Sequence, residues 1–402
     1  MLPRAVAGNG SCTASALTRQ GSRAWRLCHL ANDYTNLVPK LLASMLPQLQ
    51  ANAIMPRLVN RDYDGLAAQL GSVISVPLPP TIAVVDVTPA NTPPSTTDIT
   101  PGVANVTLDK WKEAPFHVSD KEMREIQAGS VPSCASSAMR ALIDSIDQSI
   151  LTAMSIGASG VLGTAGTNPF ATIALAIEPI TRLNDNLLPQ EGRHVVFNAS
   201  AQANLLALQQ FTDMQYTGDV GAMTNGNFLG NSRLGAQWWM DQNIRQFTNS
   251  GTQNGAYLLN GAATIGATTL AIDTGSGTFV AGDVIVIDGH RYVVAANAAS
   301  GATSLTIRAP GMRTAAADNS TITGLATHKA NFAFSRDSVV FASRPFAPSA
   351  SGVIASQSMT DPVSGITVRL EVTREHKRDR WSLDALWGTD VVRPNGVIKI
   401  AG

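Results

Sequence analysis

The sequence is poor in cysteine and has no long apolar run, and each shortage excludes a class of protein. Its only cysteines are Cys12, Cys28 and Cys134. Their spacing matches neither a zinc site nor the disulfide framework of a secreted domain, which indicates a protein made in a reducing cytoplasm. No apolar run approaches the roughly 20 residues that cross a bilayer, so we expect no membrane partner. The basic first residues also lack the apolar segment of a secretion signal.

Charge is scarce and balanced. Charged residues make up 14% of the chain, and the formal net charge is zero. A DNA-binding protein usually carries a basic excess, because neutralising phosphates drives its affinity. The composition therefore argues against a strong, uniform grip on nucleic acid and fits a chain that buries surface against neighbours. At 402 residues, the chain is long enough for two or three structural units.

No pattern of catalytic or ligand-binding residues stands out. The glycines from Gly157 to Gly166 follow a predicted helix, whereas a phosphate-binding loop follows a strand, so they predict a connector. Residues 230–235 have the wrong spacing for a nucleophile elbow and favour a turn. The histidines show no metal-ligand spacing. They are His29, His117, His194, His290, His328 and His376.

Two further pairs have plain structural interpretations. Asp144 and Asp147 share a helix face, which is more typical of solvated carboxylates than of a catalytic pair. Trp238 and Trp239 follow a predicted turn and favour core or subunit-interface packing. We therefore predict no catalytic residue, no metal site and no cofactor, and a structural or binding protein in place of an enzyme.

The N-terminal third changes character twice. Residues 1–30 contain four arginines, no acid and no apolar periodicity, and are predicted to be disordered. Apolar residues from Val38 to Leu49 then recur at helical spacing, with Pro47 expected to kink or divide the helix. Strands are predicted at 73–76, 82–85 and 103–108, around a turn-forming tract. Because two strands alone are marginal in water, this long hairpin needs a partner surface.

The strongest helix signal follows. A stripe at helical spacing runs between the boundary residues Pro132 and Gly157. Its members are Met139, Leu142, Ile143, Ile146, Ile150 and Met154. A further helix is predicted over 171–187, with Ile173, Ile177, Ile180 and Leu187 facing inward and Pro179 interrupting it. A buried strand over 194–197 then leads to Asn198, which can cap a helix that carries Leu205, Leu206 and Leu208.

Residues 252–327 form a separate region rich in glycine, alanine and threonine. Strand-like runs at 268–272, 283–287, 292–294 and 304–307 alternate with turn signals, which predicts a small β-domain inserted into another unit. Strict alternation over 366–373 predicts a half-buried strand beyond it. After a charged turn at 376–380, strands near 381–387 and 397–400 are predicted to close the chain.

The order of these segments resembles the major capsid proteins of tailed bacteriophages, the fold named for the Hong Kong 97 phage. It is most similar to coat proteins of the Salmonella podovirus type, which carry an inserted β-barrel. Segments 195–200, 234–244, 331–345 and 384–395 carry the likeness, as does 281–289 within the insertion. Ala199 stands where the family has proline, and Trp387 and Asn395 replace its tyrosine and glutamate. The insertion is also shorter than in the type member.

The resemblance implies an α+β fold with a role for each segment. Residues 1–30 would be a disordered or non-native extension, since Leu30 reads as an alternative start. The other implied units are an N-arm (31–69), an extended loop (70–122), a P-domain (123–194) with a spine helix (130–156), a first A-domain part (195–251), an inserted β-barrel (252–327), and a second A-domain part with returning P-domain strands (328–402).

The implied function is self-assembly into pentamers and hexamers of an icosahedral virion shell, built in the host bacterial cytoplasm. Scaffolding protein, a portal and double-stranded DNA bound without sequence specificity would be the partners. Some family members crosslink lysine to asparagine, and Lys110 and Lys112 lie near the loop, but no asparagine or acid is identified. The alternatives are a phage tail, fibre or decoration protein whose β-rich insertion binds a partner, and an enzyme with a nonstandard site.

Overall fold

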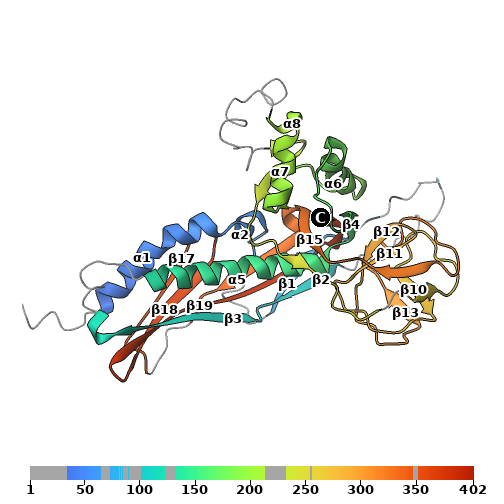
Figure 1. Cartoon of the computed structure of the whole chain (residues 1–402). Coiled ribbons are helices and arrows are strands. Elements are labelled where there is room, and N and C mark those ends of the chain that lie inside the picture. Colours follow the sequence, from blue (N-terminus) through green and yellow to red (C-terminus); the bar gives the residue numbers. More distant parts are fainter. Residues whose placement is uncertain are drawn as a thin grey trace, which may run out of the picture.

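The protein has an α+β fold in which a long helix crosses an elongated sheet (Figure 1). The computed structural model describes residues 34–64, 73–80, 82, 84, 89, 101–122, 133–212, 232–253, 256–346 and 352–402. The predicted disorder of residues 1–30 lies outside these ranges. At one end of the elongated part sits a rounded β-unit, and a cluster of helices projects from the side near it (Figure 1).

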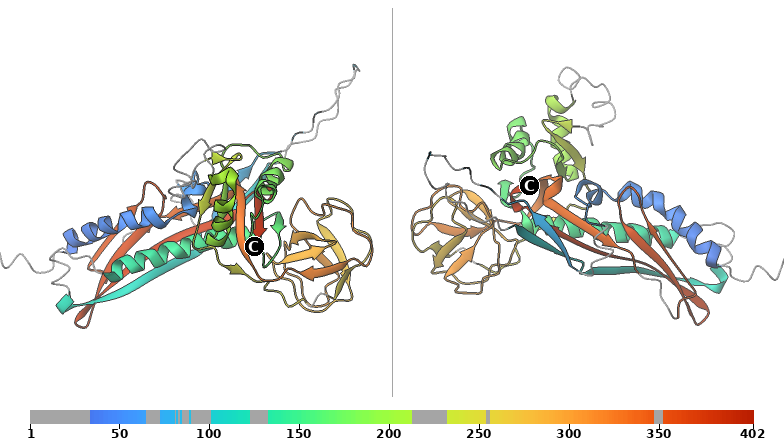
Figure 2. Two further views of the ribbon diagram at one scale, coloured as in Figure 1. Left: turned by 45° about the horizontal axis from the view of Figure 1, so that its top comes forward. Right: turned by 180° about the vertical axis from the view of Figure 1, so that it is seen from behind.

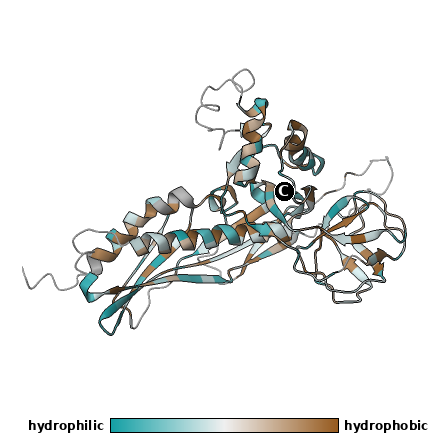
Figure 3. Ribbon diagram, in the orientation of Figure 1, coloured by the Kyte–Doolittle hydropathy of each residue, from teal (hydrophilic) through white to brown (hydrophobic). Residues whose placement is uncertain are grey.

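The elongated part is built on helix α5 (Ser133–Gly157). Its 25 residues extend over about 37 Å at the rise of an α-helix. The predicted stripe from Met139 to Met154 is confirmed, because each of its members is at most 3% exposed. Helix α1 (Tyr34–Asn52) lies beside α5 (Figure 2). Hydrophobic and hydrophilic segments alternate along both helices (Figure 3), as expected of elements buried on one side.

The predicted division of the first helix at Pro47 is wrong. Helix α1 runs through both Pro39 and Pro47. Met45 and Leu49, on either side of Pro47, are buried in the core shared with α5. This packing offsets the hydrogen bond that proline removes. The short helix α2 (Met55–Leu58) follows and also contacts α5.

The sheet beneath these helices consists of long antiparallel strands. Strand β19 (Arg378–Val391) pairs with β3 (Lys110–Ser119), β18 (Thr367–Glu375) and β16 (Val339–Arg344). Strand β17 (Ala355–Thr360) pairs with β18. The alternation predicted for 366–373 is confirmed on the helix-facing side, where Val368, Leu370 and Val372 join the core of α1 and α5. The predicted charged turn lies between β18 and β19, with Lys377 at φ 58°.

A seven-stranded sheet connects this platform to the projecting helices. Its strand order is β4-β20-β15-β5-β7-β6, and β8 also pairs with β15. The strands are β4 (Gly160–Gly163), β5 (Arg193–Phe197), β6 (Ser232–Arg233), β7 (Ala236–Met240), β8 (Gln246–Phe247), β15 (His328–Ser335) and β20 (Val397–Ala401). Trp238 is fully buried in this region, which confirms core packing for that residue.

Three helices accompany this sheet: α6 (Ile173–Asp185), α7 (Ala199–Ala207) and α8 (Gln209–Thr212). Asn198 caps α7 as predicted, its side chain accepting from the Ala201 amide at 2.9 Å. The inward face predicted for α6 is partly wrong. Ile177 is 40% and Leu187 92% exposed, whereas Ala176, Ile180 and Leu183 are buried. Ile180 and the half-buried Ile173 pack into the core as predicted, so the error lies at Ile177 and Leu187.

The rounded unit contains β9 (Tyr257–Leu259), β10 (Thr269–Asp273), β11 (Val284–Ile287), β12 (His290–Val293), β13 (Ser304–Thr306) and β14 (Thr321–Gly324). They form one sheet in the order β12-β11-β14-β9-β10-β13, around a hydrophobic core of its own. A bridge between Val294 and Ile307 links the chain just after β12 to the chain just after β13. Four of these strands lie where runs were predicted, and β9 and β14 were missed.

The hairpin consists of β1 (Val73–Leu78) and β2 (Gly102–Thr107), paired antiparallel. Of the predicted strand 82–85, Ile82 and Val84 lie outside any strand, and Ala83 and Val85 lie outside the described residues. Among the helices that the structure describes, none is both long and apolar enough to cross a membrane.

Candidate assembly surfaces

The hairpin has one buried and one exposed face. Ile74, Val76 and Val106 are at most 3% exposed, and they pack with Val340 and Ala342 of β16. The hairpin therefore has the partner surface that its sequence requires, and for the inner face that surface is strand β16 of the same chain. The outer face differs, because Val73 is 43% and Val103 57% exposed. Farther along, Val84 is 99% exposed.

A second apolar surface lies on the projecting helices, where one side of α6 is coloured hydrophobic (Figure 3). The exposed large apolar residues on and beside these helices are Leu175, Ile177, Leu187, Leu206 and Leu234, and Leu175 and Ile177 point to different sides of α6. Scattered apolar residues are ordinary on a protein surface, but a group of large ones on neighbouring elements marks an interaction site. This group and the outer hairpin face lie on different parts of the molecule.

A third surface lies on the sheet face opposite α5. Trp111, on strand β3, is 64% exposed, and its indole Nε1 donates to Asp384 at 3.1 Å. Its ring lies 5.3 Å from that of Phe346, and the Arg369 guanidinium stacks over the Phe346 ring at 4.4 Å. Arg369 is in turn paired with Asp384. The exposed indole is therefore held in place by its neighbours, which suits a contact residue, since Trp and Arg are enriched at interface hot spots.

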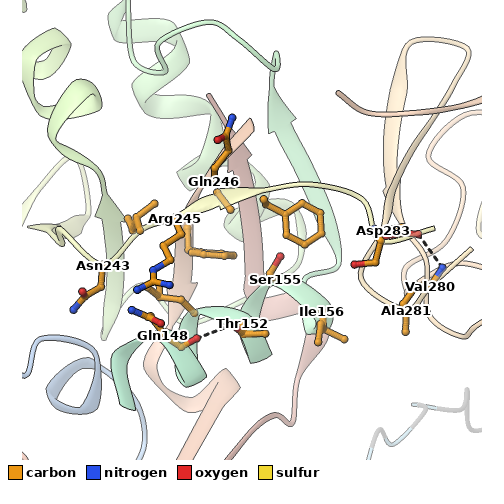
Figure 4. A pocket seen from close by; sticks show the side chains of 16 residues that line it. Gln148, Thr152, Ser155, Ile156, Asn243, Arg245, Gln246, Val280, Ala281 and Asp283 are labelled. Atoms are coloured by element: carbon orange, nitrogen blue, oxygen red, sulfur yellow. Dashed lines mark hydrogen bonds between the residues drawn. The ribbon is translucent and has the colours of Figure 1, made fainter. Parts of the chain in front are cut away.

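A cleft of about 440 Å³ lies where α5, the segment 243–250 and the rounded unit meet (Figure 4). Ile156 and Arg245 point toward it from two sides, and Asp283 and Ala281 lie on the side of the rounded unit. Asp283 has a structural role, because its carboxylate accepts hydrogen bonds from three backbone amides, those of Ser250, Gly251 and Val280. Those bonds stabilise the connection to the rounded unit.

Lys399 lies buried beside this cleft. Its Nζ is 3.1 Å from the centroid of the Phe247 ring, a cleft-lining residue, and no described residue accepts a hydrogen bond from it. Burial lowers the pKa of Lys399 well below its ordinary value, with Asp283 acting in the opposite direction. The ring face partly replaces the lost solvation of the amine.

The aspartates predicted to be solvated are not. Asp147 is 0% exposed and Asp144 is half-buried, so the prediction from their shared helix face is wrong. The segment after β7 covers them, since the Asn243 amide Nδ2 donates to Asp144 at 3.2 Å and to Asp147 at 3.3 Å. Asp241, 1% exposed, accepts from the Asn243 backbone amide at 2.7 Å. This polar cluster was missed, because nothing in the local pattern reveals a cover supplied by distant residues.

The remaining residues singled out from the sequence are dispersed. Lys110 pairs with Asp109, and Lys112 donates to Ser145 of α5 at 2.8 Å. His194 and His328 are buried on separate strands, and His117 lies 3.6 Å from Glu375. Within the described ranges, no group of three or more histidine, cysteine or acidic side chains could hold a metal ion. The glycine stretch after α5 forms β4 and a turn.

No family model and no curated protein matches this chain. Solved structures show distant similarity. A chain from Mycobacterium phage Che8 is 17% identical with a TM-score of 0.48, over 87% of this chain and 91% of that one. A chain from the capsid of cyanophage P-SCSP1u is 12% identical with a TM-score of 0.48, over 87% of this chain and 88% of that one. A chain from a virus-like particle of Pyrococcus furiosus is 9% identical with a TM-score of 0.43, over 92% of this chain and 100% of that one.

Proposed function

We propose that this protein is the major capsid subunit of a tailed bacteriophage and that copies of it build the icosahedral shell. The observation that carries the proposal is the distribution of exposed apolar side chains. They lie on the outer hairpin face, on the α6–α7 side and around Trp111, which are separate parts of one elongated chain.

Different surfaces on one subunit favour contacts between unlike faces. Such heterologous contacts generate closed rings or shells when the rotation closes, and open fibres when it does not. Each surface is modest, so affinity would come from many repeated contacts. The order of a helical arm, a hairpin, a spine helix and an inserted β-unit also agrees with the sequence resemblance to phage capsid proteins.

The finer parts of the proposal come from that resemblance. Copies would form pentamers and hexamers with the help of a scaffolding protein and a portal in the host cytoplasm. The balanced charge fits a shell that encloses double-stranded DNA without gripping it strongly. The rounded β-unit would be the inserted barrel of podovirus-type coat proteins. The proposal includes no catalytic step and no cofactor.

Sedimentation velocity and electron microscopy test this function on the purified protein, alone and with the proposed scaffolding protein. We expect closed particles in the megadalton range. A protein that stays monomeric under all conditions would contradict the proposal. Open tubes would favour the tail-protein alternative, because they arise from the same kind of contact without closure.

A further inference from the structure

Three segments far apart in the sequence meet at one buried carboxyl group. Asp147 lies on the inner side of α5 and is 0% exposed. Its carboxylate accepts from the backbone amide of Ile54, in the connection between α1 and α2, and from Asn243, in the segment after β7. Asp241 from that same segment accepts from the Asn243 amide. The Asp147 carboxyl group thus fastens two other segments to the spine helix.

Each of these two aspartates has one oxygen without a donor. Asp147 Oδ1 and Asp241 Oδ2 are buried, and no described residue donates a hydrogen bond to either. A buried oxygen without a partner costs about 1–3 kcal/mol if neutral and more if charged. A proton on one carboxyl group converts that group into a donor, which can satisfy an acceptor nearby.

Among the residues that the structure describes, the charged groups acting on these two carboxyl groups are negative. The charged groups acting on Asp147 are Asp241 and Asp144, and the one acting on Asp241 is Asp144. Arg245 is the closest basic residue in sequence. With the Gln148 amide oxygen turned toward it, its guanidinium donates to that oxygen over 2.6 and 3.1 Å. No described basic side chain forms an ion pair with Asp147 or Asp241.

We propose that Asp147 and Asp241 hold a proton in the folded chain, and that its release to solvent loosens the attachment of the α1–α2 connection and of the segment after β7 to helix α5. The joint would then be a proton-dependent clasp within a single subunit. Its existence does not depend on the capsid proposal, because every group in it belongs to one chain.

The direction of the effect follows from burial. Burial, and after it the Asp241 carboxylate, raises the pKa of Asp147 well above its ordinary value. Burial also raises the pKa of Asp241, with Asp144 adding to the rise. A carboxyl group whose folded pKa is raised stabilises the closed joint below about pH 4 and loses that contribution as pH rises through the folded pKa. The clasp is therefore tighter in acid.

Hydrogen exchange of the full-length protein measures the clasp directly, because the Ile54 and Asn243 amides donate to these carboxylates. Protection factors, corrected for the intrinsic rate at each pH, are followed from pH 5 to pH 8. We expect protection at both amides to fall by up to about tenfold per pH unit until the buried groups ionise in place, and then to level off.

Two variants and a control make the test specific. Asp147→Asn cannot ionise, keeps an oxygen for the Ile54 amide and adds a donor for Asp241, so protection at the Ile54 amide should depend on pH less than in the unmodified protein. Asp241→Asn removes the partner carboxyl group and serves if the first variant does not fold. Asp144→Asn, at the half-buried neighbour that contacts the same Asn243 side chain, should keep the pH dependence.

Two results of the exchange experiment would contradict the proposal. Protection that is flat with pH in the unmodified protein, or that falls equally in Asp147→Asn, would overturn the proposal. Calcium chloride and a chelator are added in parallel at pH 8. If calcium restores protection and the chelator abolishes it, the carboxylates hold a cation and the assignment of a proton is wrong.

Discussion

The Arg369 guanidinium donates hydrogen bonds to both carboxylate oxygens of Asp384, from Nε at 3.1 Å and from Nη2 at 2.6 Å. The two residues face each other directly across β18 and β19, and both are under 9% exposed. Arg369 also pairs with Glu371 at 3.0 Å. The result is a buried ionic group on the sheet face that carries Trp111.

Arg369→Ala would leave the Asp384 carboxylate buried without its cation. We expect the free energy of unfolding to fall by about 3–5 kcal/mol, as in other buried pairs that lose one member. Urea-induced unfolding at neutral pH measures it. Arg378→Ala is the control, because its pair with Glu375 is largely exposed and its loss should change stability by at most about 1 kcal/mol. Equal losses in the two variants would contradict this account.

Gly282, in the rounded unit, packs closely against Ile156 of the spine helix. Its φ is +95°, and a Cβ placed there would lie 2.9 Å from Cγ1 of Ile156. Gly282→Ala should therefore lower the free energy of unfolding by about 1–3 kcal/mol beyond the backbone strain alone, and increase hydrogen exchange at the end of α5.

Gly289→Ala isolates the strain, because Gly289 has φ +77° and nothing lies within 4 Å of its added Cβ. It should cost about 1–2 kcal/mol and leave exchange in α5 unchanged. If both alanine variants loosen α5 equally, the contact with Ile156 does not hold the unit.

The two faces of the hairpin should respond differently to charge. Val106→Asp places a carboxylate among Val76, Val340 and Val392, and should destabilise the chain by several kcal/mol. Val103→Asp lies on the outer face and should leave the free energy of unfolding within about 0.5 kcal/mol of the original.

If the outer face contacts another subunit, Val103→Asp should nevertheless reduce the yield of particles in sedimentation. Normal particles from this variant would remove the outer hairpin face from the assembly contacts and leave the remaining surfaces to explain them.

His194 should make the protein sensitive to acid. Burial, with a smaller contribution from Arg336, lowers its pKa from 6.5 to about 4. The unfolded chain takes up the proton below pH 6.5 and the folded chain only near pH 4, so stability should fall over that interval by up to about 3 kcal/mol. His194→Phe keeps a ring beside Phe334 and should weaken the fall in urea midpoints between pH 7 and pH 4.5. An unchanged profile would show that His194 titrates normally.

The sequence predicted best where a pattern alone determines burial. The stripe on α5 was found because six apolar residues at helical spacing admit only one inward face. The α6 stripe was predicted only in part, because Ile177 and Leu187 fit the helical period as well as Ala176 and Leu183, and only packing against the core beside the helix selects the latter two.

The polar cluster could not be found in the same way. Asp144 and Asp147 look solvated when only their own helix is considered. Their burial is decided by Ile54 and Asn243, which come from opposite sides of the helix in sequence, and no local pattern records that contact. Likewise, the hairpin looked unsupported because the strand that covers its inner face, β16, lies far along the chain.

The rounded unit is joined to the rest of the molecule through β8 and β15, which pair with each other at Phe247–His328 and Gln246–Lys329. The chain therefore leaves and returns on adjacent strands, about 5 Å apart. A foreign domain whose own ends lie side by side could be joined there in place of this unit, with loss of the contact between Gly282 and Ile156 of the spine helix. If copies of the chain form the proposed shell, that junction is a position for displaying antigens or enzymes on it.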